Sequence, residues 1–228
     1  MINSTYCVSS SGSRSLIMTV VLLCGCSLLT PSNISPPRLY SFDRTTTAST
    51  LLLSATANIN TRPVTVVVGI ARAAPGFESR QMAYIRQAHQ LEYFKQSEWI
   101  AAPATMLSPI IASALESSGQ FKAVVQAPTS ILAQFRVDVE IIRLQQEFFK
   151  LPSQVHFTLR AHVLDASTRQ VIASHEFDSY IAASSEDPYG GVIATNTVIR
   201  NVTKELADFC VQAINDQQND KKAIKKSN

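Results

Sequence analysis

The sequence predicts an α+β fold, in which a single mixed or antiparallel sheet is packed by two amphipathic helices, after a signal peptide and a flexible tether. Two successive segments, residues 130–148 and 153–165, alternate apolar and polar side chains with the period of β-strands, and residues 169–181 add a third strand after a turn. Two other segments, one after Pro103 and one after Pro188, repeat apolar residues at helical intervals. Because each pattern leaves one apolar face to be buried, we expect the helices to pack on the sheet.

The first 25 residues have the layout of a secretory signal peptide. Arg14 precedes a mostly apolar run at residues 15–23, and small residues follow that run. A helix that spans a membrane needs about 20 apolar residues, so the run is too short to be one. We therefore expect residues 1–25 to be a signal peptide that is removed from the mature chain.

Cys24 and Cys26 follow this run with one glycine between them. Their spacing is one residue too short for a Cys-x-x-Cys redox or zinc motif, and a disulfide between them would be strained. Leu23-Cys24-Gly25-Cys26 instead resembles a bacterial lipobox. This resemblance implies that Cys26 becomes the first residue of the mature chain and carries acyl chains, two or more of which anchor a protein stably. An ordinary signal peptide cut nearby is the alternative. Ser27, where an Asp would favour the inner membrane, implies sorting to the outer membrane, with the domain facing the periplasm.

Composition divides the rest of the chain into three parts. Residues 26–62 are rich in Ser, Thr, Pro and Asn, which predicts a lipidated, flexible tether. Residues 63–217 carry the strand and helix patterns and are long enough for one domain with its own core. Residues 218–228 predict a basic, disordered tail, because most of this segment is lysine and other polar residues. The basicity of the chain lies in this tail rather than on a folded face, which argues against nucleic acid as a partner.

The strands can be justified in chain order. Residues 39–42 predict a short edge strand inside the tether, and the β-branched run at 64–71 predicts a strand that is covered on both faces. A Pro-Gly turn follows, and residues 82–86 and 90–95 then predict a hairpin. The segments 130–148 and 153–165 come next and predict an antiparallel hairpin with one apolar face and one wetter face, to which residues 169–181 add a third strand.

The two helices complete the expected domain. The first begins near Trp99 and Pro103, contains Pro109 as a source of a kink, and ends at Gly119. Cys210 lies beside the apolar stripe of the second helix, where we expect it to be a small buried hydrophobe. That stripe consists of Ile199, Val202, Leu206, Phe209 and Ala213.

The histidines are the natural place to look for chemistry. His156 and His162 lie six residues apart on one predicted strand, hence on one face, but too far apart to share a metal ion. Arg160 stands between them, and Asp138 and Glu140 are on the neighbouring strand, so we expect a solvated, charged face. The sequence also lacks the nucleophile-elbow, zinc-protease and phosphate-loop motifs. We predict no catalytic residue, no metal and no cofactor; an enzyme with a site around the two histidines is the remote alternative.

Residues 74–125 resemble the ABC-type transport auxiliary lipoprotein family. The residues that carry the resemblance are Pro75 and Gly76, Met82 and Tyr84, Leu91 and Tyr93, Trp99, Pro103, and the segment from Leu115 to Phe121. The later strands and the last helix extend the resemblance to about residues 38–217. Ile100 departs from the pattern, because an Ala often follows the Trp, and the amino-terminal tether is long.

This resemblance implies a non-catalytic docking component of an MCE-type ABC phospholipid transport system between the inner and outer membranes. Its partners would be an MCE-domain protein with its permease and ATPase, and a ring of identical copies is one arrangement it allows. Tyr84, Tyr93 and Trp99 would form the contact surface, because large aromatic residues are enriched at binding hot spots; the alternative is that they fill the core. A structural or assembly lipoprotein of the cell envelope, with no role in lipid transfer, is the alternative function.

Overall fold

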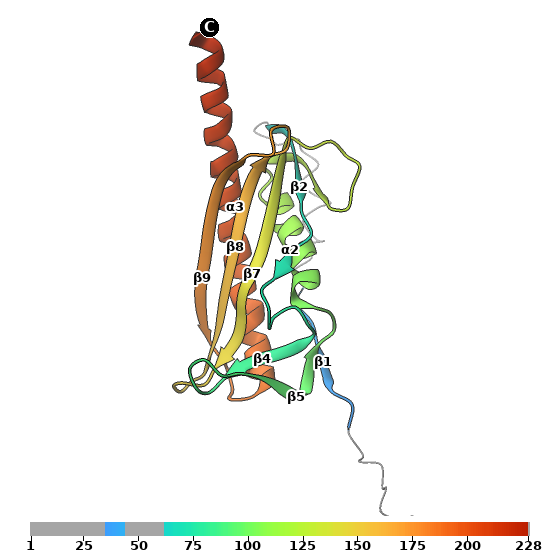
Figure 1. Cartoon of the computed structure of the whole chain (residues 1–228), viewed down its shortest axis with the longest axis vertical. Helices are drawn as coiled ribbons and strands as arrows, with labels where there is room; N and C mark the ends of the chain where they lie inside the picture. The colour runs from blue at the N-terminus through green and yellow to red at the C-terminus, as the bar shows by residue number, and fades with distance from the viewer. Residues whose placement is uncertain (1–34, 44–61, 228) are drawn as a thin grey trace, which may run out of the picture. The chain divides into compact units, whose positions relative to one another are not determined.

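The computed structural model describes residues 35–43 and 62–227 (Figure 1). The predicted signal peptide, Cys26 and most of the predicted tether lie outside the described residues. The described chain forms one sheet and two long helices, which confirms the predicted α+β class. The elements are β1 (Arg38–Tyr40), β2 (Arg62–Val68), β3 (Arg72–Ala73), β4 (Gln81–Ile85), β5 (Leu91–Trp99), α2 (Pro103–Ser117), β6 (Phe121–Gln126), β7 (Phe135–Glu147), β8 (Gln154–Asp165), β9 (Val171–Ala182) and α3 (Pro188–Ser227).

The long strand β7 organises the mixed sheet. On one side it pairs with β8 in antiparallel fashion, and β8 pairs with β9 in the same way. On its other side it pairs in parallel with three short strands placed end to end: β2, then β3, then β4. The remaining strands extend the sheet, since β6 pairs with β2, β5 with β4, and β1 with β5. The predicted hairpin and the predicted edge strand are therefore both confirmed.

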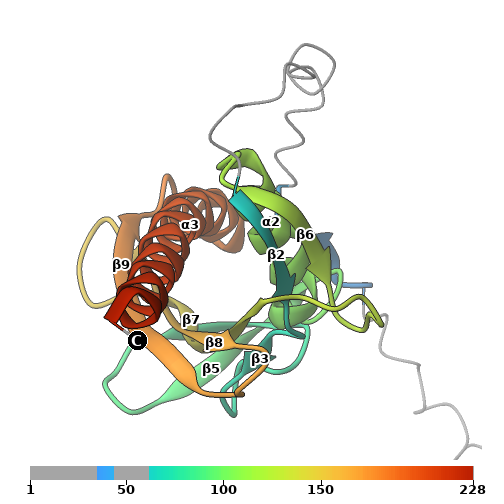
Figure 2. The same cartoon turned by 90° about the horizontal axis from the view of Figure 1, so that it is seen from above.

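Both helices pack on the same sheet. α3 lies against β8 and β9, and α2 lies against β6 and β2. Seen from above, the helices are side by side and the strands curve around them (Figure 2). The carboxyl-terminal turns of α3 extend past the ends of the strands (Figure 1). None of the helices in the described ranges has an apolar stretch long enough to cross a membrane.

The core lies between the sheet and the helices, as their apolar faces predict. Phe135, Val137, Val139 and Ile141 of β7 are buried, as predicted from their alternation. The fully buried residues of the helices are Leu107, Ile111 and Leu115 in α2 and Val198, Val202, Leu206, Cys210 and Ile214 in α3. Cys210 is a buried free cysteine, as expected, and this burial raises the pKa of its thiol to about 12.

The end of the chain corrects one expectation. We predicted a disordered tail at residues 218–228, but α3 continues to Ser227. The ammonium group of Lys221 donates to the carboxylate of Asp165, which is 2% exposed at the end of β8. Lysine and alanine are also good helix formers. This basic segment is therefore the end of a helix, and the ion pair between Lys221 and Asp165 holds it against the sheet.

A second, smaller correction concerns the start of β7. The alternating pattern begins at residue 130, whereas the strand begins at Phe135. Gln134 is bonded to Thr65 instead of continuing the strand. Its side-chain oxygen accepts from the backbone nitrogen of Thr65 at 2.7 Å, and its backbone nitrogen donates to the Thr65 carbonyl oxygen at 3.0 Å. The residues before Gln134 form a loop, in which Leu132 is 93% exposed.

Candidate functional site

Two turns lie side by side at one end of the sheet. The β4–β5 turn spans residues 86–90, and the β7–β8 turn spans residues 148–153. The backbone nitrogen of Phe148 donates to the carbonyl oxygen of Ile85 at 2.9 Å, which joins the two turns. In Figure 1 they lie at the end of the domain opposite to the carboxyl terminus of α3. We call this region the tip and define it by Tyr84, Arg86, Phe94, Phe148, Phe149 and Leu151.

The base of the tip is a cluster of half-buried aromatic rings. The ring centroid of Tyr84 lies 4.4 Å from that of Phe94 and 5.9 Å from that of Phe148. The guanidinium carbon of Arg86 lies 5.2 Å from the centroid of Tyr84, within the range of a cation–π interaction. The Tyr84 hydroxyl donates to Glu92 at 2.8 Å, and this hydrogen bond, followed by burial, raises the pKa of Tyr84. These contacts hold the rings in place before any partner arrives.

Large apolar side chains project from this base into solvent. Leu151 is 82% exposed and Phe149 is 52% exposed. A single exposed leucine needs no explanation, but a group of large apolar residues gathered at one end of a domain marks an interaction site. Aromatic residues and arginine are also the residue types that dominate binding energy in interfaces. The tip therefore has the composition of a docking surface.

The structure separates the three aromatic residues that we predicted to form one contact surface. Only Tyr84 belongs to the tip. Tyr93 pairs with Ala83 in the ladder and so points to the opposite face of the hairpin from Tyr84. Its hydroxyl donates to the carbonyl oxygen of Gly76 at 3.0 Å, and Gly76 has a φ of +94°, which favours glycine in this turn.

Trp99 is part of the core, which was the alternative interpretation. Its side chain is 3% exposed and makes an edge-to-face contact with Phe42, with 5.0 Å between the ring centroids. The prediction that Trp99 belongs to an open contact surface is therefore wrong. The residues that sequence reasoning missed are Phe148, which ends the predicted strand at 130–148, and Phe149 and Leu151, which lie between that strand and the next. Three large apolar residues in a turn were the available signal.

The histidine prediction also needs correction. His156 is 3% exposed and does not lie on a solvated face. Its Nδ1 lies 2.8 Å from Glu147 Oε1, and its Nε2 lies 2.7 Å from Asp178 Oδ1. One terminal nitrogen of Arg143 lies 3.2 and 3.1 Å from the two ring nitrogens, and Tyr180 stacks on the ring with 3.8 Å between centroids. The ring is thus enclosed by four partners.

Asp178 is an ionisable group of this cluster whose pKa is shifted. Burial opposes ionisation of Asp178, but hydrogen bonds from Thr158 and His156 outweigh it and lower the pKa of this carboxyl group. His162 is not brought to the cluster, since it lies further along β8 and pairs with Asp138 in the ladder. Within the described residues no group of three or more ligands could hold a metal ion. The cluster can fix the three long strands in register, because it joins side chains of β7, β8 and β9.

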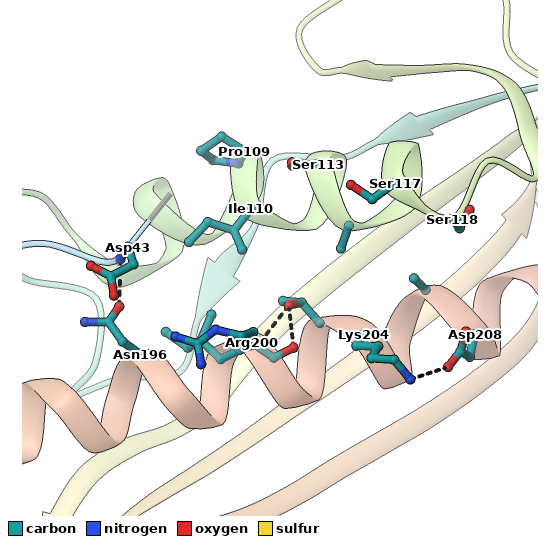
Figure 3. A pocket seen from close by; sticks show the side chains of 14 residues that line it. Asp43, Pro109, Ile110, Ser113, Ser117, Ser118, Asn196, Arg200, Lys204 and Asp208 are labelled. Atoms are coloured by element: carbon teal, nitrogen blue, oxygen red, sulfur yellow. Dashed lines mark hydrogen bonds and ion pairs between the residues drawn. The ribbon is translucent and has the colours of Figure 1, made fainter. Parts of the chain in front are cut away.

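A groove separates the two helices elsewhere on the domain (Figure 3). Its volume is about 400 Å³. α2 contributes Pro109, Ile110 and Ser117 to one wall, and α3 contributes Arg200 and Lys204 to the other. The described domain therefore has two surface features that distinguish it, the exposed tip and this open groove.

Comparison with known proteins places this domain in a family. The family model of the ABC-type transport auxiliary lipoprotein component matches residues 50–207, which is more than half of the chain. The protein belongs to this family, as its resemblance in residues 74–125 predicted. It is therefore a lipoprotein auxiliary component of ABC-type transport, and an auxiliary role favours a non-catalytic protein. Among curated proteins, no relative matches the chain.

Solved structures share the fold. A crystal structure of a protein from Xanthomonas campestris superposes with a TM-score of 0.66 at 18% sequence identity, covering 81% of this chain and 97% of that chain. An uncharacterized protein superposes with a TM-score of 0.56 at 10% identity, covering 79% of this chain and 99% of that chain. At these identities the likeness shows the fold alone.

Proposed function

We propose that this protein is the non-catalytic docking component of an MCE-type ABC phospholipid transport system, anchored in the outer membrane through Cys26 and facing the periplasm. Membership of the ABC-type transport auxiliary lipoprotein family carries the proposal. The partners are an MCE-domain protein and, through it, the permease and the ATPase. The lipobox-like motif at residues 23–26 supports the anchor, and Ser27 supports outer-membrane sorting.

The tip is the surface that docks the partner. Burial of a leucine or phenylalanine side chain that was exposed contributes about 1.5–3 kcal/mol, and the tip exposes two such side chains, Phe149 and Leu151. Their aromatic base is held by ring contacts and by Arg86, so little side-chain freedom is lost on binding. A rigid apolar surface at one end of the domain is suited to end-on contact with the far end of a long partner.

An affinity purification tests the proposal. The Cys26-anchored protein is crosslinked in vivo, purified from gently solubilised membranes, and its partners are identified by mass spectrometry. We expect an MCE-domain protein together with its permease and ATPase. Recovery of only envelope-assembly or peptidoglycan-linked proteins would overturn the transport role and favour a structural lipoprotein. Fractionation of the same membranes tests the location, because inner-membrane recovery would contradict outer-membrane sorting.

A further inference from the structure

The groove between α2 and α3 exists because the residues facing across it are small. α2 presents Ser113, Ala114 and Ser117, and α3 presents Thr203 and Ala207. Packed helices normally fill the space between them with interdigitating side chains. Here the short side chains leave about 400 Å³ open between the helices (Figure 3).

The floor of the groove is apolar. Ile199, Thr203 and Ala207 follow one another along α3 and are all buried. The hydroxyl group of Thr203 donates to the carbonyl oxygen of Ile199 at 2.7 Å, so it is already satisfied within the helix. Ile110 of α2 faces this floor and is half-buried. A hydrocarbon chain laid on the floor would meet no unsatisfied polar group from these residues.

A polar ridge borders the floor along α3. Asn196, Arg200, Lys204 and Asp208 are spaced four residues apart, so each stands about one helical turn from the next (Figure 3). At 1.5 Å per residue the ridge is about 18 Å long. One leaflet of a bilayer is half of a hydrocarbon core of about 30 Å, so one acyl chain spans about 15 Å. The floor, from Ile199 to Ala207, is about 12 Å long by the same rise, so it takes most of one acyl chain.

Two cations of the ridge are available to an anion. Arg200 is exposed, and no carboxylate of the described residues lies within ion-pair distance of it. Lys204 pairs with Asp208 at 3.6 Å, but both side chains are largely exposed, and such pairs contribute little. Asp43 and Asp208 stand near the two ends of the groove. A headgroup with one negative charge fits this arrangement, because the two acids repel further negative charge.

We propose that the α2–α3 groove binds a phospholipid, with one acyl chain on the floor and the phosphate diester at Arg200 and Lys204. A volume of about 400 Å³ is at the low end for ligand sites, so the groove holds one chain rather than the whole lipid. The inference deepens the proposed function and rests on it for the source of the lipid. It gives the docking component a second role, in which it holds lipid as well as a partner.

Photo-crosslinking tests the proposal on the full-length, membrane-extracted protein. The probe is a phosphatidylethanolamine that carries a diazirine near the end of one acyl chain. We expect crosslinked peptides from residues 109–118 and 196–208. Ser117→Phe fills the groove and should lower crosslinking at least tenfold. Glu116→Phe is the matched control, because Glu116 is the exposed neighbour on α2 that does not line the groove, and it should crosslink normally.

A charge-reversal pair separates the headgroup from the chain. Arg200→Glu combined with Lys204→Glu should weaken crosslinking by about tenfold, whereas Lys122→Glu, an exposed site away from the groove, should leave it unchanged. Circular dichroism melts confirm that each variant is folded. Equal crosslinking in Ser117→Phe and wild type, or crosslinks that map elsewhere, would overturn the groove as a lipid site.

The affinity purification of the same variants keeps the two proposals apart. If the groove binds lipid, Ser117→Phe loses the lipid crosslink and still captures the MCE-domain protein through the tip. The wild-type protein could instead crosslink to the lipid but capture no transport component. That result overturns the docking function and leaves the groove supported as a lipid site. Loss of partner capture in Ser117→Phe, with no lipid crosslink in the wild type, shows that a protein segment occupies the groove and overturns the lipid site.

Discussion

The ammonium group of Lys221, near the end of α3, donates to the buried carboxylate of Asp165 at the end of β8. The same carboxylate accepts from the backbone nitrogen of Ser167 at 2.9 Å and from the Ser167 hydroxyl at 2.5 Å. One side chain therefore organises the β8–β9 turn and fastens the last turns of the helix to it. This contact explains why a segment with the composition of a solvated tail continues as a helix.

Removal of the contact should free the end of α3. In Lys221→Met we expect residues 218–227 to exchange their amide hydrogens faster, because the buried acceptor loses its charged donor. Ser167 donates only to Asp165 Oδ1, so the substitution leaves the buried Oδ2 without its donor, and such a loss costs about 1–3 kcal/mol. Hydrogen exchange measured by mass spectrometry checks the local effect. Lys222→Met is the control, since Lys222 is exposed and no ion pair of the described residues involves it.

The same contact predicts a pH dependence. Hydrogen bonds from Lys221 first, and then from Ser167, hold the pKa of Asp165 well below its usual range. A lowered folded-state pKa contributes stability above the unfolded pKa of about 3.9, and that stability is lost as the pH falls further. Urea unfolding between pH 6 and pH 3 should show this loss in the wild type and a smaller loss in Asp165→Asn. Parallel curves for the two proteins would contradict it.

Trp99 should behave as a core residue and not as a contact residue. Trp99→Ala removes a large side chain that packs on Phe42, and such truncations cost about 3–5 kcal/mol. Urea unfolding measures this change. The exposed neighbour Ile100 is the control, and Ile100→Ala should change the free energy of unfolding by less than about 0.5 kcal/mol. A stable Trp99→Ala protein that fails to capture its partner would restore the contact-surface interpretation.

The sequence predicted the fold well where periodicity decides it. The alternation in β7 and β8 correctly assigned the core face from Phe135 to Ile141, and the helical stripe correctly assigned Val202 and Leu206. Long elements with one apolar face allow few arrangements, because each apolar face must be buried against the apolar face of another element. The ends of the strands were harder to predict. The start of β7, for example, depends on the hydrogen bonds between Gln134 and Thr65, which the alternation of apolar and polar residues does not reveal.

The environment of His156 could not be predicted because of one irregularity in the ladder. Ile141 pairs with Leu159, but Arg143 pairs with Thr158, so the register shifts between them. A shift by one residue moves all later side chains of β7 to the other face. Arg143 and Glu147 thereby join His156 on one face, although strict alternation would place them on the face opposite to Glu140. The cluster depends on this bulge.

Cys210 should be unreactive in the folded protein. Burial raises the pKa of its thiol to about 12, so at pH 8 only about one thiol in ten thousand is ionised, and the thiolate is the reactive form. A thiol reagent should label Cys210 only after the chain is unfolded in urea. Because the folded pKa is raised, its contribution to stability is present below the unfolded pKa of about 8.5 and is lost as the pH rises toward 12. Rapid labelling of the native protein would contradict this placement.

Cys26 should carry the acyl chains. Cys26→Ser should abolish incorporation of labelled palmitate and release the protein from membranes, because no acyl chain then holds it. Cys24→Ser is the matched control, two residues away, and should leave lipidation intact. Mass spectrometry of the amino-terminal peptide identifies the modified residue. Membrane retention of the Cys26→Ser protein, or a mature chain that begins elsewhere, would favour the ordinary signal peptide.

The exposed residues of the tip should be needed for partner capture but contribute little to the free energy of unfolding. Leu151 and Phe149 are exposed, so Leu151→Ser combined with Phe149→Ser should change the free energy of unfolding by less than about 1 kcal/mol. The same pair should reduce capture of the MCE-domain protein at least tenfold, since loss of buried apolar anchors at a hot spot costs about 2 kcal/mol or more. Quantitative affinity capture measures the ratio to wild type.

Leu132 provides the control that makes this test specific. It is 93% exposed, more than Leu151, but it precedes β7, whereas the tip lies at the other end of that strand. Leu132→Ser removes as much exposed apolar surface as Leu151→Ser and should leave capture unchanged. If both single variants weaken capture equally, general hydrophobicity and not the tip accounts for binding. If neither does, the partner uses another face of the domain.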